Sequence, residues 1–490
     1  MGARIDGSLS GHSGLIRTDG YLAGEWVLSA TRDVFDVFNP DTQQVVARVA
    51  NFSADELDTF VCAAVEAFHS WRRSTAAQRA SVLSDWADMV LAHEDALAHI
   101  MTLEQGKPLS ESVGEVRYAA SYLNWFAEEA RRIYGDVIPA PLPDRTITAT
   151  KEPVGVCVAI TPWNFPLAMI TRKAAPALAA GCSMIAKPSE ETPLSALALA
   201  ELASRAGVPN GVFSVFPTTH SAAFGDAVMA DKRVRKVSFT GSTRVGQILG
   251  NQSGKTIKRL SLELGGNAPL LVFDDADIDA AVEGTMASKF RNAGQTCVCT
   301  NRILVQDPIR ATFEKRLCER VADLKVGSGL DAAVAIGPLI NDAAVSKVET
   351  LVSAARDNGA CVLAGGVRHQ TGCQFYSPTV VSCPHTDFDI LREEIFGPVA
   401  VIASFRSEEE AIRLANETEA GLAAYVFTRN ASRIMRVSRA LEYGMVGVNT
   451  GLISSEVIPF GGVKYSGYGR EGSKYGIDDY TDIRTVVVQH

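Results

Sequence analysis

Several features that would define a broad protein class are missing from the sequence. It contains no uninterrupted run of about 18 apolar residues, which a membrane-spanning helix requires, and its first residues lack the apolar core of a secretory signal. Neither CxxC nor HExxH occurs, so a zinc site is not expected. We therefore expect a cytoplasmic protein that does not act at a membrane and holds no metal.

Positive charge is also scarce. The 47 Lys and Arg residues are outnumbered by 56 Asp and Glu, so the net charge of -9 offers no broad surface for nucleic acid. Nine cysteines are scattered over 490 residues, an odd number without the spacing of a disulfide scaffold. With 47% hydrophobic and 21% charged residues, the chain resembles a folded globular protein of two or three domains.

The order of helical and strand patterns predicts the fold class. Residues 54–135 carry mainly helical periodicity, with amphipathic stretches at about 76–104 and 111–133. Over 154–273, short β-branched runs alternate with helical segments, and a second pattern of this kind fills 277–450. Strands separated by helices imply crossover connections and a parallel sheet. Because no flexible linker divides the patterns, we expect an α/β protein of interleaved domains.

Cys297, in FRNAGQTCVCTNR, is a candidate nucleophile. A thiol attacks electrophiles when it is partly ionised and accessible, and the neighbouring Asn292, Gln295 and Thr296 make this segment polar. Gly294 allows close backbone approach. The alternative is a buried cysteine that acts as a small hydrophobic side chain.

Two further polar residues stand where a site is expected. Glu263 follows a strand-like run and precedes Gly265 and Gly266, a position at which open α/β sheets expose their sites, so it could act as a general base. Asn164 lies between two prolines in TPWNFP, and a fixed amide there could donate to a developing oxyanion. The alternatives are a surface carboxylate and an ordinary Pro-rich turn.

Two strand ends are candidates for nucleotide contacts. Gly241 and Ser242 follow the strand VSFT and open a helix, whose N-terminal amides can bind phosphate. Lys187 and Glu190, in KPSE after the strand SMIA, could hold a ribose diol. Either segment alone could be an ordinary loop. The only GxGxxG string, at 467–472, follows no strand, so we reject it as a dinucleotide fingerprint.

Six motifs occur in one order along the chain, namely TPWNFP, KPSE, FTGST, LELGG, GQTC and EEIFGPV. Together they closely resemble the NAD(P)-dependent aldehyde dehydrogenase superfamily, over nearly the whole chain. The resemblance implies a Rossmann-type cofactor domain interleaved with an α/β catalytic domain and a small β oligomerisation element. The implied ranges are 1–127 and 147–262 for the NAD-binding domain, 263–453 for the catalytic domain, 128–146 and 470–490 for oligomerisation, and 454–469 for a loop returning to the cofactor domain and substrate mouth.

The resemblance also implies the catalytic roles. Cys297 would attack the aldehyde, and the alkoxide would be held by the side-chain amide of Asn164 and the backbone N–H of Cys297. Hydride transfer to the nicotinamide would leave a thioester, and Glu263 would activate the water that hydrolyses it. Transfer to coenzyme A is the alternative, which a water-activating base disfavours. The implied cofactor contacts are Trp163, Lys187, Glu190, Gly241, Ser242, Leu264, Glu394 and Phe396.

Glu190 bears on the choice of cofactor. A carboxylate can accept hydrogen bonds from both ribose hydroxyls, whereas it repels a 2′-phosphate. The sequence therefore predicts a preference for NAD, and use of NADP through Lys187 is the open alternative.

The substrate prediction depends on details that resemble the succinate-semialdehyde dehydrogenase branch. Arg172 lies eight residues after Asn164, Arg291 six before Cys297, and Ser454 matches a further carboxylate contact of that branch. Two guanidiniums suit a substrate with a distal carboxylate, although both could instead be structural ion-pair partners. We expect oxidation of succinate semialdehyde to succinate. Glutarate semialdehyde, one methylene longer, and a broader range of aldehydes are the alternatives.

Three further implications follow from the same resemblance. Cys299 could form a reversible disulfide with Cys297 that stops activity, or it could simply be a small residue of the loop. Tyr465 and Tyr468 stand where this branch more often carries Gln and Leu, in a loop expected near an interface or the substrate mouth. A C-terminal edge strand implies a homodimer or homotetramer. A non-catalytic protein on this fold is disfavoured because all three catalytic candidates are present.

Overall fold

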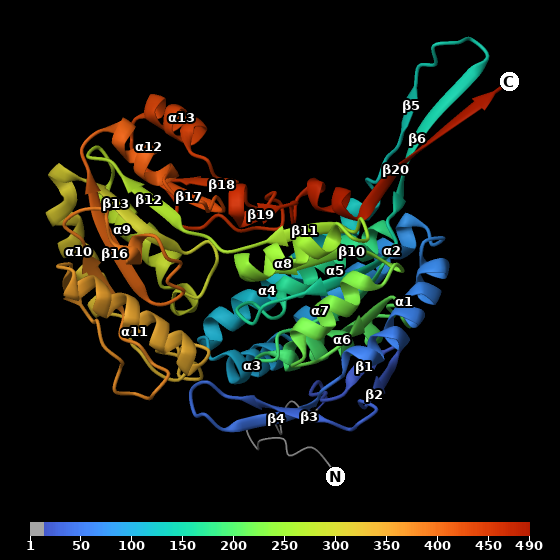
Figure 1. The fold of residues 1–490 in the computed structure, drawn as a ribbon, viewed down its shortest axis with the longest axis horizontal. Helices are drawn as coiled ribbons and strands as arrows, with labels where there is room; N and C mark the ends of the chain where they lie inside the picture. Colours follow the sequence, from blue (N-terminus) through green and yellow to red (C-terminus); the bar gives the residue numbers. More distant parts are fainter. Residues whose placement is uncertain (1–13) are drawn as a thin grey trace.

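The computed structural model describes residues 14–490 and contains an eight-stranded sheet at its centre (Figure 1). Strands β11, β10, β7, β8 and β9 are parallel, and antiparallel strands flank them. Both faces are buried, because Val156 and Val158 of β7 enter one core and Cys157 and Ala159 enter another. In sheet order the strands are β19 (Gly467–Tyr468), β11 (Arg259–Glu263), β10 (Val234–Thr240), β7 (Val156–Ile160), β8 (Ser183–Lys187), β9 (Phe213–Val215), β1 (Gly20–Leu22) and β2 (Glu25–Val27).

Helices cover both faces of this sheet. One face packs against α1, α7 and α8, and the other packs against α5 and α6, outside which α2, α3 and α4 lie. Glycine at 181 ends α5 in the left-handed region, as the return into β8 requires. These helices are α1 (Leu57–Trp71), α2 (Ala76–Ala92), α3 (Glu94–Gln105), α4 (Leu109–Ala130), α5 (Ala168–Ala180), α6 (Pro193–Arg205), α7 (Ser221–Ala230) and α8 (Thr243–Ser253).

A seven-stranded sheet forms the second layered unit, on the left of Figure 1. All its neighbouring strands are parallel except the edge pair β14 and β15. Its order is β14 (Cys361–Ala364), β15 (Thr379–Ser382), β16 (Val399–Phe405), β13 (Thr300–Gln306), β12 (Ala268–Val272), β17 (Ala423–Phe427) and β18 (Met445–Val448). The accompanying helices are α9 (Ile278–Lys289), α10 (Arg310–Ala322), α11 (Asp342–Asp357), α12 (Glu408–Asn416) and α13 (Ala431–Ala440).

Two small antiparallel sheets complete the fold. One pairs β3 (Val34–Phe38) with β4 (Val45–Ala50). The other has β6 (Arg145–Pro153) between β5 (Asp136–Ile138) and β20 (Thr481–Gln489), and it projects from the body of the molecule (Figure 1). The predicted oligomerisation element and domain ranges stay predictions.

The predicted α/β class and aldehyde dehydrogenase-like fold are confirmed, while one stretch predicted as helical is interrupted. The amphipathic stretch 76–104 is two helices, because His93 leaves helical geometry at φ -115 and its ring nitrogen bonds the carbonyl of Met89. Periodicity continued across the break, so the pattern did not reveal it. Within 14–490, no helix has both the length and the apolar character needed to cross a bilayer.

Candidate active site

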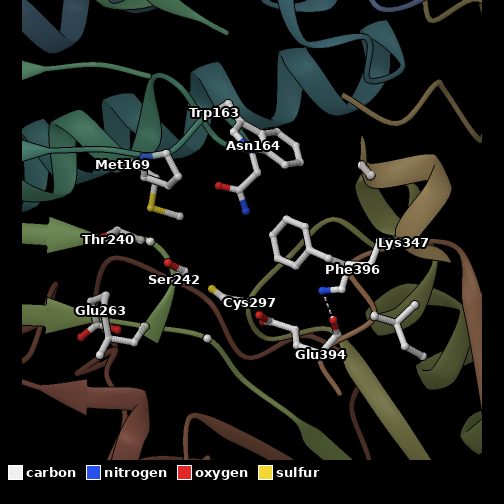
Figure 2. A pocket seen from close by; sticks show the side chains of 16 residues that line it. Trp163, Asn164, Met169, Thr240, Ser242, Glu263, Cys297, Lys347, Glu394 and Phe396 are labelled. Atoms are coloured by element: carbon white, nitrogen blue, oxygen red, sulfur yellow. Dashed lines mark hydrogen bonds between the residues drawn. The ribbon is translucent and has the colours of Figure 1, made fainter. Parts of the chain in front are cut away.

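The carboxyl ends of β7, β10 and β11 open into one cavity of about 280 Å³, which also reaches the segments before β13 and β16. Side chains from these distant segments converge there (Figure 2). Such a crevice at parallel strand ends is the usual site in open α/β sheets. Nine of the predicted residues line it, namely Trp163, Asn164, Gly241, Ser242, Glu263, Leu264, Cys297, Glu394 and Phe396.

Cys297 is half-buried, with its sulfur turned to the cavity (Figure 2). Burial raises the pKa of this thiol to about 12, and the nearby Arg172 lowers it less than burial raises it. Burial therefore favours the protonated form of the thiol in this arrangement. The proton must leave the thiol as it attacks. A neighbouring base is needed for that step.

Glu263 supplies a carboxylate in the same cavity. It is the last residue of β11 and is 3% exposed, and neither side-chain oxygen hydrogen-bonds to any residue of 14–490. Burial, reinforced by the negative charge of Glu471, raises the pKa of Glu263 well above its ordinary value. A buried carboxylate with a raised pKa and free oxygens has the properties of a general base.

Asn164 lies opposite these two residues and points its amide toward Cys297 (Figure 2). Its Nδ2 donates to the carbonyl of Gln295 at 3.0 Å, which leaves the second N–H of that nitrogen for another acceptor. Close packing brings the strand-end and nucleophile segments together, because a Cβ on Gly266 would lie 2.3 Å from the carbonyl oxygen of Cys297. The hydrogen bond to Gln295 likewise puts the Asn164 segment in direct contact with the segment that carries Cys297.

A second, narrow cavity adjoins Cys297 on the other side. It is lined by Arg172, Arg291 and Ser454, which are the three predicted substrate contacts. The Nε of Arg172 lies 2.8 Å from Glu471 Oε2, so Arg172 is in part a structural ion-pair partner, as the alternative prediction had it. Its Nη2, however, has no hydrogen-bond partner within 14–490. Arg291 forms no ion pair among the described side chains. Two guanidiniums therefore face the same cavity with unused donors.

Cys299 lies apart from these cavities. It is buried, and its thiol donates to the carbonyls of Lys289 and Thr300 at 3.5 and 3.6 Å. Both Cys297 and Cys299 are free thiols. The predicted disulfide between them stays a prediction.

Comparison with known proteins bears on the identity of this site. Residues 26–486 match the aldehyde dehydrogenase family. The chain belongs to that family. The match covers the seven-stranded sheet and the parallel strands of the eight-stranded sheet, so the chain is an enzyme that oxidises aldehydes with NAD or NADP.

Individual relatives of this aldehyde dehydrogenase are similar over almost their full length. A mitochondrial succinate-semialdehyde dehydrogenase of Arabidopsis thaliana is 54% identical over 97% of this chain and 90% of its own. An NADP(+) succinate-semialdehyde dehydrogenase of Escherichia coli strain K12 is 52% identical over 97% and 98%. A glutarate-semialdehyde dehydrogenase of Pseudomonas aeruginosa is 52% identical over 96% and 97%. The crystal structure of a succinate-semialdehyde dehydrogenase from Burkholderia pseudomallei superposes with a TM-score of 0.96, at 53% identity over 97% and 98%.

The strand ends of this aldehyde dehydrogenase fit a dinucleotide. Ser242 caps α8 through its hydroxyl, which accepts from the amide of Val245, and both Gly241 and Ser242 line the cavity where this helix begins. Gly265 allows Glu394 to approach the strand end, since a Cβ there would come within 2.9 Å of a carboxylate oxygen of Glu394. At the end of β8, Lys187 Nζ lies 3.0 Å from Glu190 Oε2. These two residues do not line the main cavity, although their strand neighbours β7 in the same sheet.

Other residues of the site were not predicted. Glu471 accepts a hydrogen bond from Lys173 and forms an ion pair with Arg172. Because Glu471 lies almost 300 positions after Lys173 and Arg172 in the sequence, no local pattern predicts these contacts. Tyr465 lies near Thr243, on the side of the cofactor cavities, and not at the substrate cavity. The part of the chain from 14 to 490 brings no three metal-ligand side chains together. The unpredicted cavity residues include Met169, Thr240, Lys347, Tyr118, Phe165 and Phe460.

Proposed function

We propose that this aldehyde dehydrogenase oxidises succinate semialdehyde to succinate, with NAD as its preferred cofactor. The observation that carries the proposal is the shared narrow cavity of Arg172, Arg291, Ser454 and Cys297. A guanidinium binds a carboxylate through a planar pair of donors, so this cavity suits an aldehyde with an anionic far end. The names of relatives at 52–54% identity support the same substrate.

In the proposed mechanism, Cys297 attacks the aldehyde carbon and Asn164 Nδ2 donates to the oxygen that becomes negative. Because the pKa of the thiol is raised to about 12, Glu263 takes its proton. Trp163, Glu394 and Phe396 would hold the nicotinamide, which would accept a hydride. Glu263 releases the thiol proton to solvent before hydrolysis. It then removes a proton from the water that attacks the Cys297 thioester and returns it to the departing thiolate, and succinate leaves.

The carboxylate-binding role leads to a test with substrates of different charge. Changing Arg291 to Gln should raise KM for succinate semialdehyde about 10- to 100-fold, because a hydrogen bond to a charged group contributes about 1.5–3 kcal/mol. The KM for butanal, which has no carboxylate, should change less than about twofold. Arg172→Gln should act in the same direction, with some added loss of stability because Arg172 also pairs with Glu471. Equal increases for both aldehydes in both variants would reject the carboxylate clamp.

Glutarate semialdehyde is the second candidate substrate, since a glutarate-semialdehyde dehydrogenase is 52% identical to this chain. One methylene changes the binding free energy by only about 1–3 kcal/mol, so both semialdehydes should be accepted. A panel of four- and five-carbon semialdehydes compared by kcat/KM assigns the preference.

The preference for NAD is proposed from Glu190, beside Lys187 at the end of β8. Changing Glu190 to Ala should shift the NAD-to-NADP ratio of kcat/KM at least ~10-fold toward NADP, because it removes a repelling charge and frees the Lys187 ammonium. The neighbouring Glu191 bonds Asn341 instead, so Glu191→Ala should leave the ratio unchanged. A native enzyme that prefers NADP, or equal ratios in the two variants, would contradict the proposal.

We also propose that two or four copies assemble through the projecting sheet of β5, β6 and β20. Val137 of β5 and Ile483 of β20 are 78% and 75% exposed. Strand β20 is an edge that another subunit can cover. A cytoplasmic location stays a prediction.

A further inference from the structure

Lys107 lies directly behind the candidate oxyanion donor. It follows α3 in the sequence QGKP, and its side chain is fully buried. The ammonium donates to the main-chain oxygen of Asn164 at 2.6 Å and to Glu115 Oε2 at 2.6 Å. It also lies 4.2 Å from the ring centroid of Phe165. Burying an ammonium is costly unless it is paired, so these contacts define its position closely.

A second donor reaches the same carbonyl. Asn292 Nδ2 lies 3.0 Å from the oxygen of Asn164, and Asn292 is in turn held by Gln105 and by Glu111, which accepts from its amide at 2.7 Å. Asn292 has a left-handed backbone with φ 50, which an asparagine adopts only at some cost. It precedes Cys297 by five residues, so the turn after α3 touches both the oxyanion and the nucleophile segments.

The acidic partner of Lys107 holds the other end of the Asn164 segment. Glu115 Oε1 accepts from the main-chain amides of Leu167 and Ala168, at 3.0 and 3.2 Å, where α5 begins. The Lys107–Glu115 pair therefore fixes the carbonyl of Asn164 and the amides three and four residues later. None of these contacts uses the side-chain amide of Asn164, which stays directed into the cavity (Figure 2).

We propose that Lys107 is a positioning residue for aldehyde attack, which it promotes by fixing the backbone of Asn164 so that the amide faces the oxygen of the aldehyde. Lys107 lines neither cavity beside Cys297 and so acts through Asn164 and not on the substrate. The inference rests on the proposed function of Asn164. Displacing a preorganised group by as little as 1 Å can cost about 100-fold in rate.

The test variant must avoid an unpaired buried carboxylate. Lys107→Met alone would leave Glu115 charged and enclosed, so it is combined with Glu115→Gln, whose amide oxygen can still accept from the start of α5. Lys258→Met is the matched control, because Lys258 is also buried and donates to the carbonyl of Val234 at 2.9 Å, away from both cavities. Denaturant unfolding first establishes that each variant is folded.

We expect the paired Lys107/Glu115 variant to lower kcat/KM for butanal ~10- to 100-fold, with the KM for NAD changed less than about twofold. The Lys258 control should stay within about twofold of the native enzyme. The same pair is then introduced into Asn164→Ala. If Lys107 acts through Asn164, the pair should lower kcat/KM less than about threefold in that background.

Two outcomes would overturn the inference. An equal fold-decrease in both backgrounds would mean that Lys107 does not act through Asn164, while the role of Asn164 itself stands. Unchanged kcat/KM in the folded paired variant would have the same meaning. If Asn164→Ala alone has native kcat/KM, the proposed oxyanion role fails, and the positioning role of Lys107 fails with it.

Discussion

Changing Cys297 to Ala should abolish aldehyde oxidation, with kcat falling at least ~10⁴-fold and the free energy of unfolding little changed. The thiol is the only nucleophilic side chain of the described residues that lines both the cofactor cavity and the arginine-lined cavity. Without it no covalent bond to the aldehyde carbon can form. Neither Asn164 nor Glu263 can substitute, because an amide is not a nucleophile and the carboxylate serves as base. NADH formation followed by absorbance measures the loss.

The matched control for this result is Cys318→Ala. Cys318 is also half-buried but lies in α10 and lines neither cavity, so its loss should leave kcat within about twofold of the native value. Retention of more than about 1% of kcat by the Cys297 variant would contradict a covalent mechanism at this residue.

Changing Glu263 to Gln should separate the two halves of the reaction. The amide cannot remove a proton from water, so thioester hydrolysis should slow by about 10²–10⁴-fold. A burst of at most one NADH per subunit should precede a slower steady rate. Because Glu263 also takes the proton of Cys297 in the proposed mechanism, the burst should form more slowly than in the native enzyme. Quenched-flow measurement of NADH gives both rates.

The pH dependence provides a second test of Glu263. Its pKa is raised, and a base acts only when deprotonated, so kcat of the native enzyme should rise with pH through that pKa. The Glu263→Gln variant should lose this rise. Glu201→Gln is the control, because Glu201 is buried in ion pairs with Arg17 and Arg205 far from the cavity. A steady rate without a burst, or an unchanged pH profile in Glu263→Gln, would contradict the assignment.

The sequence was sufficient to predict the alternation of strands and helices because several strands of the two large sheets, among them β7, β10, β13 and β16, are short β-branched runs. The predicted strands SMIA and VSFT lie within β8 and β10. The break at His93 was missed, since both flanking helices are amphipathic and the periodicity passes through it. Strands β1 to β4 were not predicted.

Only those residues of the candidate site that belong to sequence motifs could be predicted. Trp163, Glu263 and Cys297 lie in short polar segments at strand ends or loops, which the sequence reveals one by one. The buried charges behind them are different. Lys107 and Glu471 appear in the sequence as ordinary surface charges, and only tertiary contact places them against Asn164 and Arg172. The raised pKa of Cys297 likewise depends on burial that local sequence does not encode.

The composition of the chain gave the least information about the charge of its substrate. A chain with net charge -9 would be expected to repel an anionic aldehyde, yet Arg172 and Arg291 line one cavity beside Cys297. The position of these two arginines near Cys297 matters more for substrate binding than the net charge of the chain, because screening by salt confines the effects of surface charges to about 10 Å.

The most direct test of the account is mass spectrometry of the Glu263→Gln enzyme, quenched after incubation with succinate semialdehyde and NAD. Because hydrolysis is slowed, the account predicts a succinyl group on one peptide only, the one that contains Cys297, in an amount equal to the NADH burst. Omitting NAD should leave that peptide without the succinyl group. A burst of NADH with an unmodified Cys297 peptide, or with the succinyl group on another residue, would contradict the account.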